Sequence, residues 1–442
     1  IDDVTSIEDA MTEPRDPALD TLVPETWTLR ALFTIVVLGL CAGVQLSDQG
    51  IQSLSLSSIQ KSFGVSDAAL GAVQGLAGFF VGSLVAIPLS RLVDKFSRKY
   101  ILLCLIITST AMMILSALAP NFALFFLGRS SAGILEFAMI PLVYSMIPDL
   151  APERDRVLAN LGFAALMAAG ASGGFYFGGD IIAAGERVFP FAMDAWRKGF
   201  LLISISGLPL LLLGLLTLDP PRYRGLVGIH VSDSLTKFFR NRWKLMVQFL
   251  GMAGFMLLAV QALNQLVALA MERRFDADLP TIGQSMGVIL LIVSAGSIPA
   301  AGILDRLLER YLGYSSRPAI MGLAAAIAIP ASVSMLVVSR IDYAFTAVGV
   351  FMFITATANA LVPTMLQDLI PAPLRARIFA IWSFLVSIFS ALGPLIAGLL
   401  SDFAVQRNLL QAITITIVPA LIVSACFAMS LVAATRKDTR AV

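Results

Sequence analysis

The sequence is short of charge. Only 14% of its 442 residues are Asp, Glu, Lys or Arg, while 58% are hydrophobic. An ordinary soluble domain has about 25% charged residues. So few charges cannot cover a water-exposed surface, and this composition excludes a soluble globular protein. The net charge of +2 gives no reason to expect nucleic-acid binding. We expect a chain whose solvent is lipid.

Histidine and cysteine are also scarce, and this excludes several kinds of chemistry. The sequence has one histidine, His230, and its three cysteines lie inside apolar runs without paired spacing. This pattern predicts neither a disulfide framework nor a metal site. The sequence also offers no nucleotide-binding loop and no nucleophile with a nearby base. We therefore predict no cofactor, no metal and no catalytic residues, which means that the chain is not an enzyme.

Long apolar runs, in contrast, are abundant. A helix needs about 20 mainly apolar residues to cross the hydrocarbon core of a membrane. This rule predicts an all-α membrane protein with twelve transmembrane helices, at residues 28–58, 67–89, 100–118, 122–147, 157–179, 198–216, 245–271, 279–303, 319–338, 343–366, 378–400 and 409–434. The tails and even-numbered connections hold 22 Lys and Arg residues, against 8 in the odd-numbered connections. Cytoplasmic loops of membrane proteins carry an excess of Lys and Arg. We therefore expect both termini in the cytoplasm and a multi-pass protein of the inner (plasma) membrane.

The longest polar connection separates the sixth span from the seventh and divides the chain into two halves. We expect a cytoplasmic acidic tail at 1–27, an N-terminal six-helix half at 28–218, a cytoplasmic central loop with an amphipathic segment at 219–244, a C-terminal six-helix half at 245–434 and a cytoplasmic tail at 435–442. The central loop ends in a basic and aromatic run from Lys237 to Lys244. Such a run suits a helix that lies on an anionic membrane surface.

The two halves repeat each other in sequence. Residues 87–100 read IPLSRLVDKFSRKY and residues 298–311 read IPAAGILDRLLERY, which align without a gap. The Ile-Pro pair, the Asp followed by a base and the final base-Tyr recur in register. A weaker repeat links residues 146–152 to residues 365–371. Parallel repeats of this kind occur in transporters that are built from two similar six-helix halves.

The segment from Ser90 to Lys99 resembles the loop 2–3 signature of the major facilitator superfamily, with Ser90 and Ser97 in place of its two usual glycines. The resemblance covers the full length of the chain. It implies two six-helix halves related by a pseudo-two-fold axis around one central cavity. It also implies a conformational latch that holds the outward-open state, formed by Asp94, Lys95, Arg98, Asp305 and Arg306. The alternative is that the basic residues of this loop only fix the topology.

Four further segments resemble the Spinster branch of that superfamily: residues 66–71, 87–89, 129–136 and 141–154. That branch is associated with proton-linked movement of lysolipids and sphingolipid-like amphiphiles. Its first span carries an Asp-Arg pair, whereas this chain has Asp48-Gln49. The resemblance implies a lipid-like solute, and the missing arginine leaves the coupling details open.

Three ionisable residues lie inside predicted spans, where each costs at least ~2.5–3.5 kcal/mol on insertion scales and usually marks a pathway. They are Asp48 in the first span, and Arg129 and Glu136 in the fourth. Arg129 and Glu136 share one helix face, about 10 Å apart in depth. We predict that Glu136 is the main protonation site, Asp48 a second titrating or substrate-linked acid and Arg129 a movable counter-ion. The alternative is a static ion-pair cluster that holds the two spans together.

Amides and aromatic residues of the spans are candidates for the substrate cavity. Gln45, Asp48 and Gln52 form one polar stripe on the first span. The predicted substrate-cavity residues are Gln45, Gln52, Tyr144, Gln261, Asn264, Gln265, Asn359 and Trp382. The alternative is that these side chains only form hydrogen bonds between helices.

The sequence therefore predicts a secondary active transporter that moves a small amphipathic or lipid-like solute by alternating access, coupled to protons. We expect a monomer whose partners are this solute, protons and membrane lipid, without nucleic acid. One alternative is a proton symporter for a small organic acid, which a cationic residue in the C-terminal half of the cavity would favour. The other alternative is a non-transporting sensor on the same scaffold.

Overall fold

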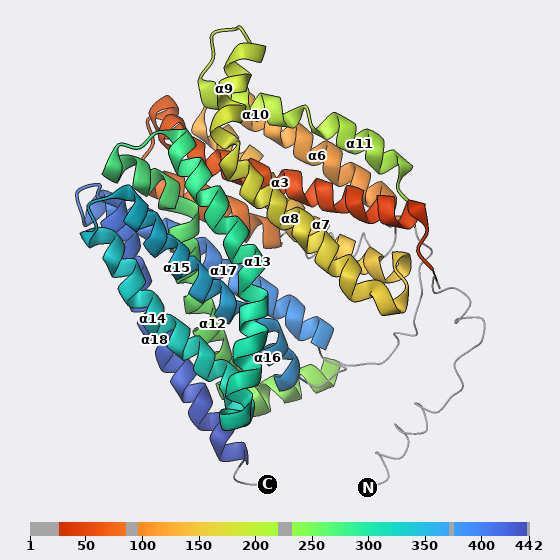
Figure 1. Ribbon diagram of the computed structural model, residues 1–442, viewed down its shortest axis with the longest axis vertical. Coiled ribbons are helices and arrows are strands. Elements are labelled where there is room, and N and C mark those ends of the chain that lie inside the picture. The colour runs from red at the N-terminus through yellow and green to blue at the C-terminus, as the bar shows by residue number, and fades with distance from the viewer. Residues whose placement is uncertain (1–25, 85–95, 220–231, 371–374, 440–442) are drawn as a thin grey trace.

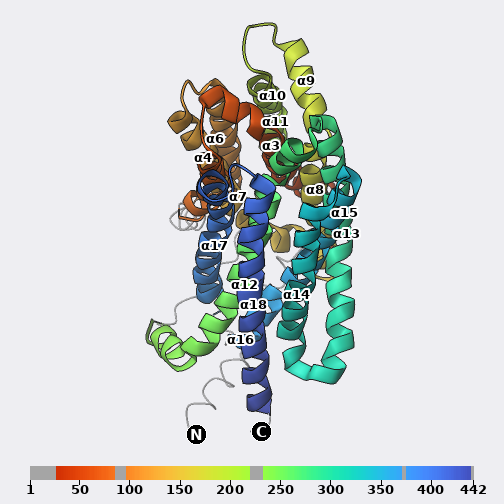
Figure 2. The ribbon, with the colours of Figure 1, turned by 90° about the vertical axis from the view of Figure 1, so that its left-hand side faces the viewer.

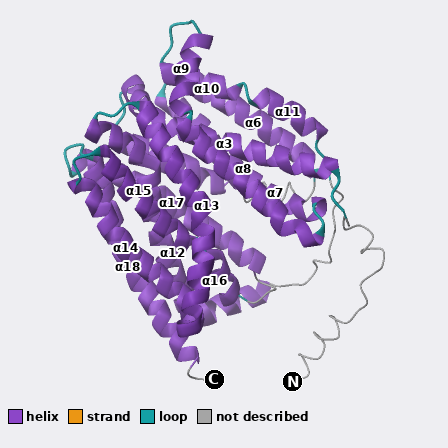
Figure 3. Ribbon diagram, in the orientation of Figure 1, coloured by secondary structure: helices purple, strands orange, loops and turns teal. Residues whose placement is uncertain are grey.

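The computed structural model describes residues 26–84, 96–219, 232–370 and 375–439, and within these ranges the chain forms helices joined by short loops (Figure 3). The predicted acidic tail up to residue 25, Asp94, Lys95 and His230 lie outside the described residues. We call the helices before residue 219 the N-half: α3 (Leu29–Phe63), α4 (Asp67–Ala72), the π-helix η1 (Val73–Val81), α6 (Arg98–Leu118), α7 (Phe122–Leu150), η2 (Glu153–Asp155), α8 (Arg156–Tyr176), α9 (Gly178–Val188), α10 (Ala195–Ser204) and α11 (Gly207–Leu216).

The helices from residue 232 onward form the C-half. They are α12 (Ser232–Phe275), α13 (Leu279–Leu312), η3 (Gly313–Ser315), α14 (Ser316–Val337), α15 (Ile341–Asn359), α16 (Val362–Leu369), α17 (Arg375–Phe403) and α18 (Leu409–Thr439). Several of these helices are longer than the sequence predicts. For example, α13 has 34 residues and is about 51 Å long at 1.5 Å per residue, which exceeds a hydrocarbon core of about 30 Å. Its end therefore extends beyond the membrane core.

Eleven helical segments of the described residues are long and apolar enough to cross a membrane. They match the predicted spans except the fourth, which corresponds to α7, a helix of 29 residues whose side chains are described only in part. Many large apolar side chains on the outer surface of the helices are exposed, such as Leu29, Leu216 and Val337. A soluble protein rarely exposes apolar surface on this scale, whereas lipid accommodates it.

Polar residues at the helix ends explain where the helices begin and end. The Thr28 side chain accepts a hydrogen bond from the Ala31 N–H at the start of α3, and Asn121 caps α7 in the same way. At the other end of α3, Gly64 adopts φ +63° and its N–H donates to the Gln60 carbonyl. A left-handed glycine is a common way to end a helix. This residue lets the chain turn back into α4.

The basic and aromatic run of the central loop is part of α12. The backbone departs from helical geometry at Arg242 (φ −120°, ψ 18°), which bends the helix there. The segment before the bend turns away from the bundle (Figure 2). Arg240, Trp243 and Lys244 are exposed, while Phe238 is buried. The predicted position of this segment on the membrane surface stays a prediction.

Each half is a bundle held by its own contacts, and the halves meet chiefly in two places. Within the N-half, α3 packs on α8 and α6 on α7; within the C-half, α12 packs on α17 and α18. Between the halves, α4 and η1 pack on α17, and α8 packs on α13. Figure 1 shows α8 and α13 side by side near α9 and diverging toward the opposite end, where α3 begins and α18 ends. We call the former the closed end and the latter the termini end.

Glycines let the two halves approach closely. A Cβ atom on Gly71 would lie 2.2 Å from the Pro394 carbonyl oxygen, and one on Gly75 would lie 2.2 Å from the Ala391 carbonyl oxygen. In the other pair, a Cβ on Gly287 of α13 would come within 2.7 Å of the Tyr176 side chain on α8. Small residues bring helices close enough for dense packing in membranes. The seam between the halves therefore depends on glycine at these positions.

Candidate functional site

The centre of the candidate site is a buried ion pair within the N-half. Arg129 on α7 donates a hydrogen bond of 2.6 Å from Nη1 to Oδ2 of Asp48 on α3. The exposed fractions are 3% for the Arg129 side chain and 0% for that of Asp48. The structure thus brings together two of the three ionisable residues that the sequence places inside spans.

The pair leaves polar atoms unsatisfied. Oδ1 of Asp48 and Nε of Arg129 are buried and have no hydrogen-bond partner among the described residues. The guanidinium carbon of Arg129 lies 5.4 Å from the centre of the Phe200 ring, so the cation has an aromatic neighbour of the kind that stabilises it. An orphaned carboxylate oxygen in an apolar interior is costly. Asp48 therefore has room in its bonding for a proton, a water molecule or a solute group.

Glu136 lies on the same helix as Arg129, seven residues further along α7. Seven residues correspond to nearly two turns and about 10 Å, so the two residues share a helix face. The side chain of Glu136 lies outside the described residues. Its assignment as the main protonation site stays a prediction.

Two of the predicted cavity glutamines take part in a hydrogen-bond network centred on Gln74 of η1. Nε2 of Gln52 donates to Oε1 of Gln74 at 2.5 Å, and Nε2 of Gln74 donates to Oγ of Ser53 and to the carbonyl oxygen of Gln265. Gln45 is buried one turn before Asp48. The Gln265 contact joins the N-half to the C-half. For Gln52, these bonds match the alternative that its side chain only forms hydrogen bonds between helices. Nothing in the sequence pattern distinguishes Gln74 as the centre of the network.

Two of the predicted polar residues of the C-half have unsatisfied amide oxygens. Oδ1 of Asn264 on α12 and Oδ1 of Asn359 on α15 are buried without a hydrogen-bond partner among the described residues. The neighbouring Gln265 donates to Oε1 of Gln261 at 3.3 Å. Unsatisfied amide groups of this kind are free to bind a solute or water.

The two predicted aromatic residues have different surroundings. Tyr144 on α7 is 46% exposed, and its ring packs edge-on against Phe163 of α8 at 5.5 Å. Trp382 on α17 is partly buried, and its ring centre lies 4.8 Å from that of Phe249 on α12. Tyr144 keeps a surface that a solute can contact, whereas Trp382 also holds two helices of the C-half together.

A second charged cluster closes the seam at the closed end. Arg273 at the end of α12 donates to both carboxylate oxygens of Asp67 at the start of α4, at 2.8 and 2.7 Å, and also to Gln60. Ser401 of α17 donates to Oδ2 of Asp67 at 2.6 Å. Because Arg273 and Ser401 belong to the C-half and Asp67 to the N-half, this cluster holds the halves together. In the sequence alone, Arg273 is only one of the charges that indicate topology.

Asp402 adds a helix cap that crosses the same seam. Its two carboxylate oxygens accept hydrogen bonds from the backbone N–H groups of Asp67 and Ala68, at 3.1 and 2.8 Å. An acidic side chain at a helix N-terminus satisfies free N–H groups and complements the helix dipole. Here the helix belongs to the N-half and the acid to the C-half.

Comparison with known families identifies this architecture. The family model described as "Major Facilitator Superfamily" matches residues 38–362, which is most of the chain. The chain belongs to the Major Facilitator Superfamily. The family and the fold that the sequence predicts are confirmed, and the chain is a multi-pass membrane transporter by family rather than a member of an enzyme family.

Solved structures of superfamily members share this fold. Two crystal structures of a bacterial homolog of the human lysosomal transporter Spinster, inward-facing and either unoccupied or occupied, each align with a TM-score of 0.74 at 18% identity. They cover 92% and 94% of this chain, and this chain covers 96% and 98% of them. A D-xylose–proton symporter aligns with a TM-score of 0.66 at 15% identity, over 89% of this chain and 97% of that chain.

A match among curated sequences is shorter. The uncharacterized transporter YwfA of the superfamily, from Bacillus subtilis (strain 168), is 30% identical over 112 residues, which are 25% of this chain and 26% of that protein. This chain thus aligns with about a quarter of the length of that relative.

The charged motif that the sequence repeats in each half is built from ion pairs. In the N-half, Arg98 at the start of α6 forms a 2.5 Å ion pair with Asp149 and also donates to the Ser145 carbonyl. In the C-half, Arg317 pairs with Asp305 at 3.0 Å and also with Asp368. Each of these ion pairs joins residues of a single half.

The ungapped repeat between residues 87–100 and 298–311 loses register after Asp305. Arg317 follows Arg98 by 219 residues, and Asp368 follows Asp149 by the same 219. Arg306, which the sequence places in the latch, is exposed, and Arg317 takes the position that corresponds to Arg98. The base-Tyr pair at 310–311 follows its N-half counterpart by 211 residues, so it does not share the offset of the ion pairs. The latch role of Arg98, Asp305 and Arg306 stays a prediction, and the latch residues Asp94 and Lys95 lie outside the described residues.

Proposed function

We propose that the chain is a secondary active transporter that moves an amphipathic, lipid-like solute by alternating access, coupled to protons through Asp48, Arg129 and Glu136. The observation that carries this proposal is the buried ion pair with one orphaned carboxylate oxygen. Breaking a buried pair is costly, and replacing such a pair with apolar residues often stabilises a protein. A pair that stays in a membrane interior is therefore best explained by a function that needs its charges.

The chemistry follows from the count of charges. Arg129 can balance one carboxylate, so the other acid is neutral only when it carries a proton. While Arg129 pairs with Asp48, Glu136 holds the proton. If the Arg129 side chain turns from Asp48 toward Glu136 on the same helix, Asp48 takes up one proton from the aqueous side that is open and Glu136 releases one. The interior stays neutral in both arrangements, and a proton crosses the membrane only when uptake and release occur in opposite access states. A low dielectric favours the neutral acid and a nearby cation favours the charged acid, which makes this exchange sensitive to the position of Arg129.

Alternating access turns this exchange into coupling. The closed end is sealed by the cluster around Asp67 and by close packing of α8 on α13, and the halves diverge toward the termini end. The similarity to inward-facing crystal structures supports an assignment of this conformation to the inward-facing state. The acid that exchanges its proton here would exchange it with the other side once the closed end opens.

The class of solute is inferred from the lining. The buried polar side chains of the described C-half are hydroxyl groups, and unsatisfied amides at Asn264 and Asn359 add neutral hydrogen-bonding groups. A strongly ionic solute would need a side chain of opposite charge in the C-half to bind it. An amphipathic solute, with one polar group near Asp48 and an apolar body against the C-half, fits this distribution of charge.

The experiment is solute-driven proton movement in proteoliposomes with an internal pH dye. Wild-type protein, Glu136→Gln and Asp48→Asn are each offered lysolipids, cationic drugs and small organic acids, with Glu186→Gln on the exposed face of α9 as the matched control. We expect lysolipid to move protons with wild type and the control, and Glu136→Gln to abolish this movement. Full coupling in Glu136→Gln would refute the assignment, and a response only to organic acids would favour the symporter alternative.

A further inference from the structure

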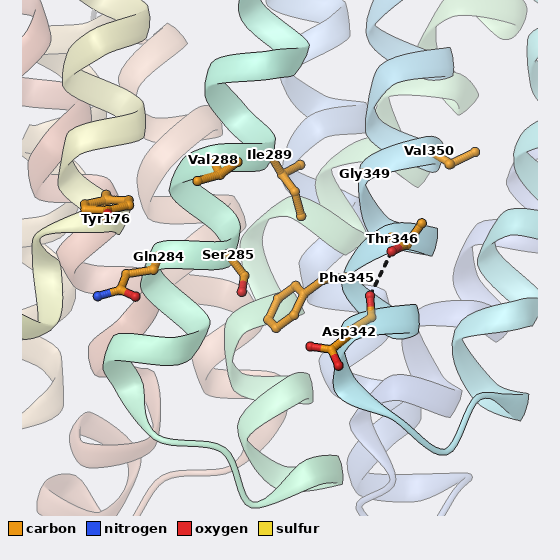
Figure 4. A pocket seen from close by; sticks show the side chains of 10 residues that line it. All are labelled: Tyr176, Gln284, Ser285, Val288, Ile289, Asp342, Phe345, Thr346, Gly349 and Val350. Atoms are coloured by element: carbon orange, nitrogen blue, oxygen red, sulfur yellow. Dashed lines mark hydrogen bonds between the residues drawn. The ribbon is translucent and has the colours of Figure 1, made fainter.

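A groove on the outer surface of the C-half runs between α13 and α15, away from the ion pair. Its first part, with a volume of about 630 Å³, is lined by α13, α15 and Tyr176 of α8. Its second part, about 240 Å³, shares Ile289, Gly349 and Val350 with the first and continues deeper to Phe353 and Ile354. Figure 4 shows the first part, with α13 and α15 as its two walls.

The groove is polar at one end and apolar along its length. Asp342, Gln284 and Ser285 lie at its mouth, near the closed end, where α13 and α15 begin (Figure 4). Beyond them the lining is mainly apolar, as at Val288 and Val350, and the Thr346 hydroxyl donates to the Asp342 carbonyl. From Asp342 to Ile354 the groove follows α15 for 12 residues, about 18 Å at 1.5 Å per residue. One leaflet of a hydrocarbon core about 30 Å thick has a depth of about 15 Å, so the groove is as long as one leaflet is deep.

Charges of both signs lie at or beside the mouth: Asp342 lines it, and Arg340 lies next to it as the ion-pair partner of Asp342. Asp342 is 70% exposed and forms a 3.0 Å pair with Arg340, which is 69% exposed. The guanidinium of Arg340 lies over the Tyr343 ring at 5.4 Å from its centre. An exposed pair of this kind holds its charges only weakly, so both remain available to a ligand. An acid beside a base matches a headgroup that has an ammonium group beside a phosphate.

We propose that this groove binds one zwitterionic phospholipid of the leaflet at the closed end. Its ammonium group contacts Asp342, its phosphate contacts Arg340, and one acyl chain lies along Ile289, Val350 and Phe353. A third cavity of about 400 Å³ shares Phe353 and Ile354 and continues between α13 and α14 toward the termini end. It lies beyond the depth of one leaflet and is not needed for this lipid.

The position of the groove gives the lipid a conformational effect. Tyr176 belongs to the N-half, and a Cβ on Gly287 of α13 would lie 2.7 Å from it, so one wall of the mouth exists only while α8 packs on α13. A ligand that binds one conformation better shifts the population toward it. The lipid therefore stabilises the conformation with a sealed closed end. This consequence rests on the alternating access of the proposed function, whereas the binding itself does not.

Native mass spectrometry of the purified protein, with phosphatidylethanolamine or phosphatidylglycerol added, tests the binding. Asp342→Asn removes the charge at the mouth, and Val350→Trp fills the groove. The matched controls are Asp180→Asn, an exposed acid on α9, and Ile415→Trp on α18, which is 42% exposed against 45% for Val350.

We expect phosphatidylethanolamine adducts to fall about two- to fivefold with Asp342→Asn, the effect of one exposed charge pair, while phosphatidylglycerol adducts do not change. Val350→Trp lowers the adducts of both lipids, and both controls behave as wild type. Equal adducts in wild type, Asp342→Asn and Val350→Trp, or an equal loss with Ile415→Trp, would overturn the proposal. Because adducts are counted without transport, failure here leaves the proton-coupled transport of the proposed function untouched, and the reverse also holds.

The conformational effect is measured by spin-label distances across the closed end, between Lys61→Cys on α3 and Gln411→Cys on α18. Both positions are exposed and lie outside the groove. In nanodiscs, with the exposed Cys104 and Cys426 replaced by Ser so that only the two introduced cysteines carry labels, phosphatidylethanolamine shifts the distribution of label-to-label distances toward the short distance. This shift disappears with Val350→Trp. An identical shift in Val350→Trp would place the lipid elsewhere and overturn the effect.

Discussion

The N-half and the C-half share a plan of helices but bury different chemistry. Among the described residues, the buried ionisable side chains apart from cysteine are Asp48, Asp67, Arg98, Arg129 and Lys198, all in the N-half. The buried polar side chains of the C-half are those of serine and threonine. The two halves therefore differ in what they bury: the described N-half buries charged side chains, and the described C-half buries neutral hydroxyl groups among apolar ones.

The strongest way to break this comparison is to remove the cation of the buried pair. Arg129→Met leaves the Asp48 carboxylate buried without a partner, and we expect a loss of stability of about 3–5 kcal/mol. The double variant with Asp48→Leu should regain most of it, because both charges are gone. Thermal unfolding in detergent measures both variants. A single variant as stable as wild type would show that Asp48 is already neutral.

A second test compares the equivalent ion pairs of the two halves. Arg98 is 7% exposed and Arg317 is 20% exposed. Hydrogen bonds to charged groups contribute about 1.5–3 kcal/mol when well buried, so Arg98→Ala should approach this loss and Arg317→Ala should lose less. Thermal unfolding again gives the ranking. Equal losses would mean that exposure does not distinguish the two motifs.

A third test concerns the seam between the halves. Gly75→Ala places a methyl group 2.2 Å from the Ala391 carbonyl, whereas a Cβ on Gly78 meets nothing within 4 Å. Overpacking of this kind costs about 1–3 kcal/mol. We expect Gly75→Ala to widen the spin-label distances across the closed end while Gly78→Ala leaves them unchanged. If both variants match wild type, the halves do not depend on this contact.

The smallest expected effect comes from the cap that crosses the seam. Asp402→Ala removes the acceptor for the N–H groups of Asp67 and Ala68, and loss of a helix cap costs about 0.5–2 kcal/mol. Because the cap forms only when the halves are in contact, we expect a modest shift of the Lys61–Gln411 label distance toward the open population. Unchanged distances would contradict this expectation and would show that the cap does not favour contact between the halves.

Much of this architecture can be predicted from the sequence because membrane-spanning helices consist of long apolar runs. The family, the helical fold and the two halves are of this kind, and so is the meeting of Asp48 with Arg129, since charge inside a span has few places to go. The depth of a residue in a span depends only on local helix geometry. Such features need no knowledge of distant contacts.

The features that the sequence did not reveal depend on contacts between distant segments. Asp67 meets Arg273 and Asp402 across more than 200 residues of chain, and neither end of these contacts is unusual by itself. Gln74 became the centre of a network only because η1 packs on α12 and brings it near Gln265. The correspondence of Arg317 with Arg98 was hidden because α13 extends to residue 312 before the next helix begins.

The Asp402 cap has a consequence for the route by which this end can open. When the C-half moves away, the first two N–H groups of α4 lose their acceptor, and hydrocarbon offers no substitute. Only water can take the place of the carboxylate. Separation at this end must therefore admit solvent between the halves before or as they part, and a sideways parting toward the lipid would leave those groups unsatisfied. The fold thus favours an opening between the halves at the closed end that faces the aqueous phase rather than the lipid.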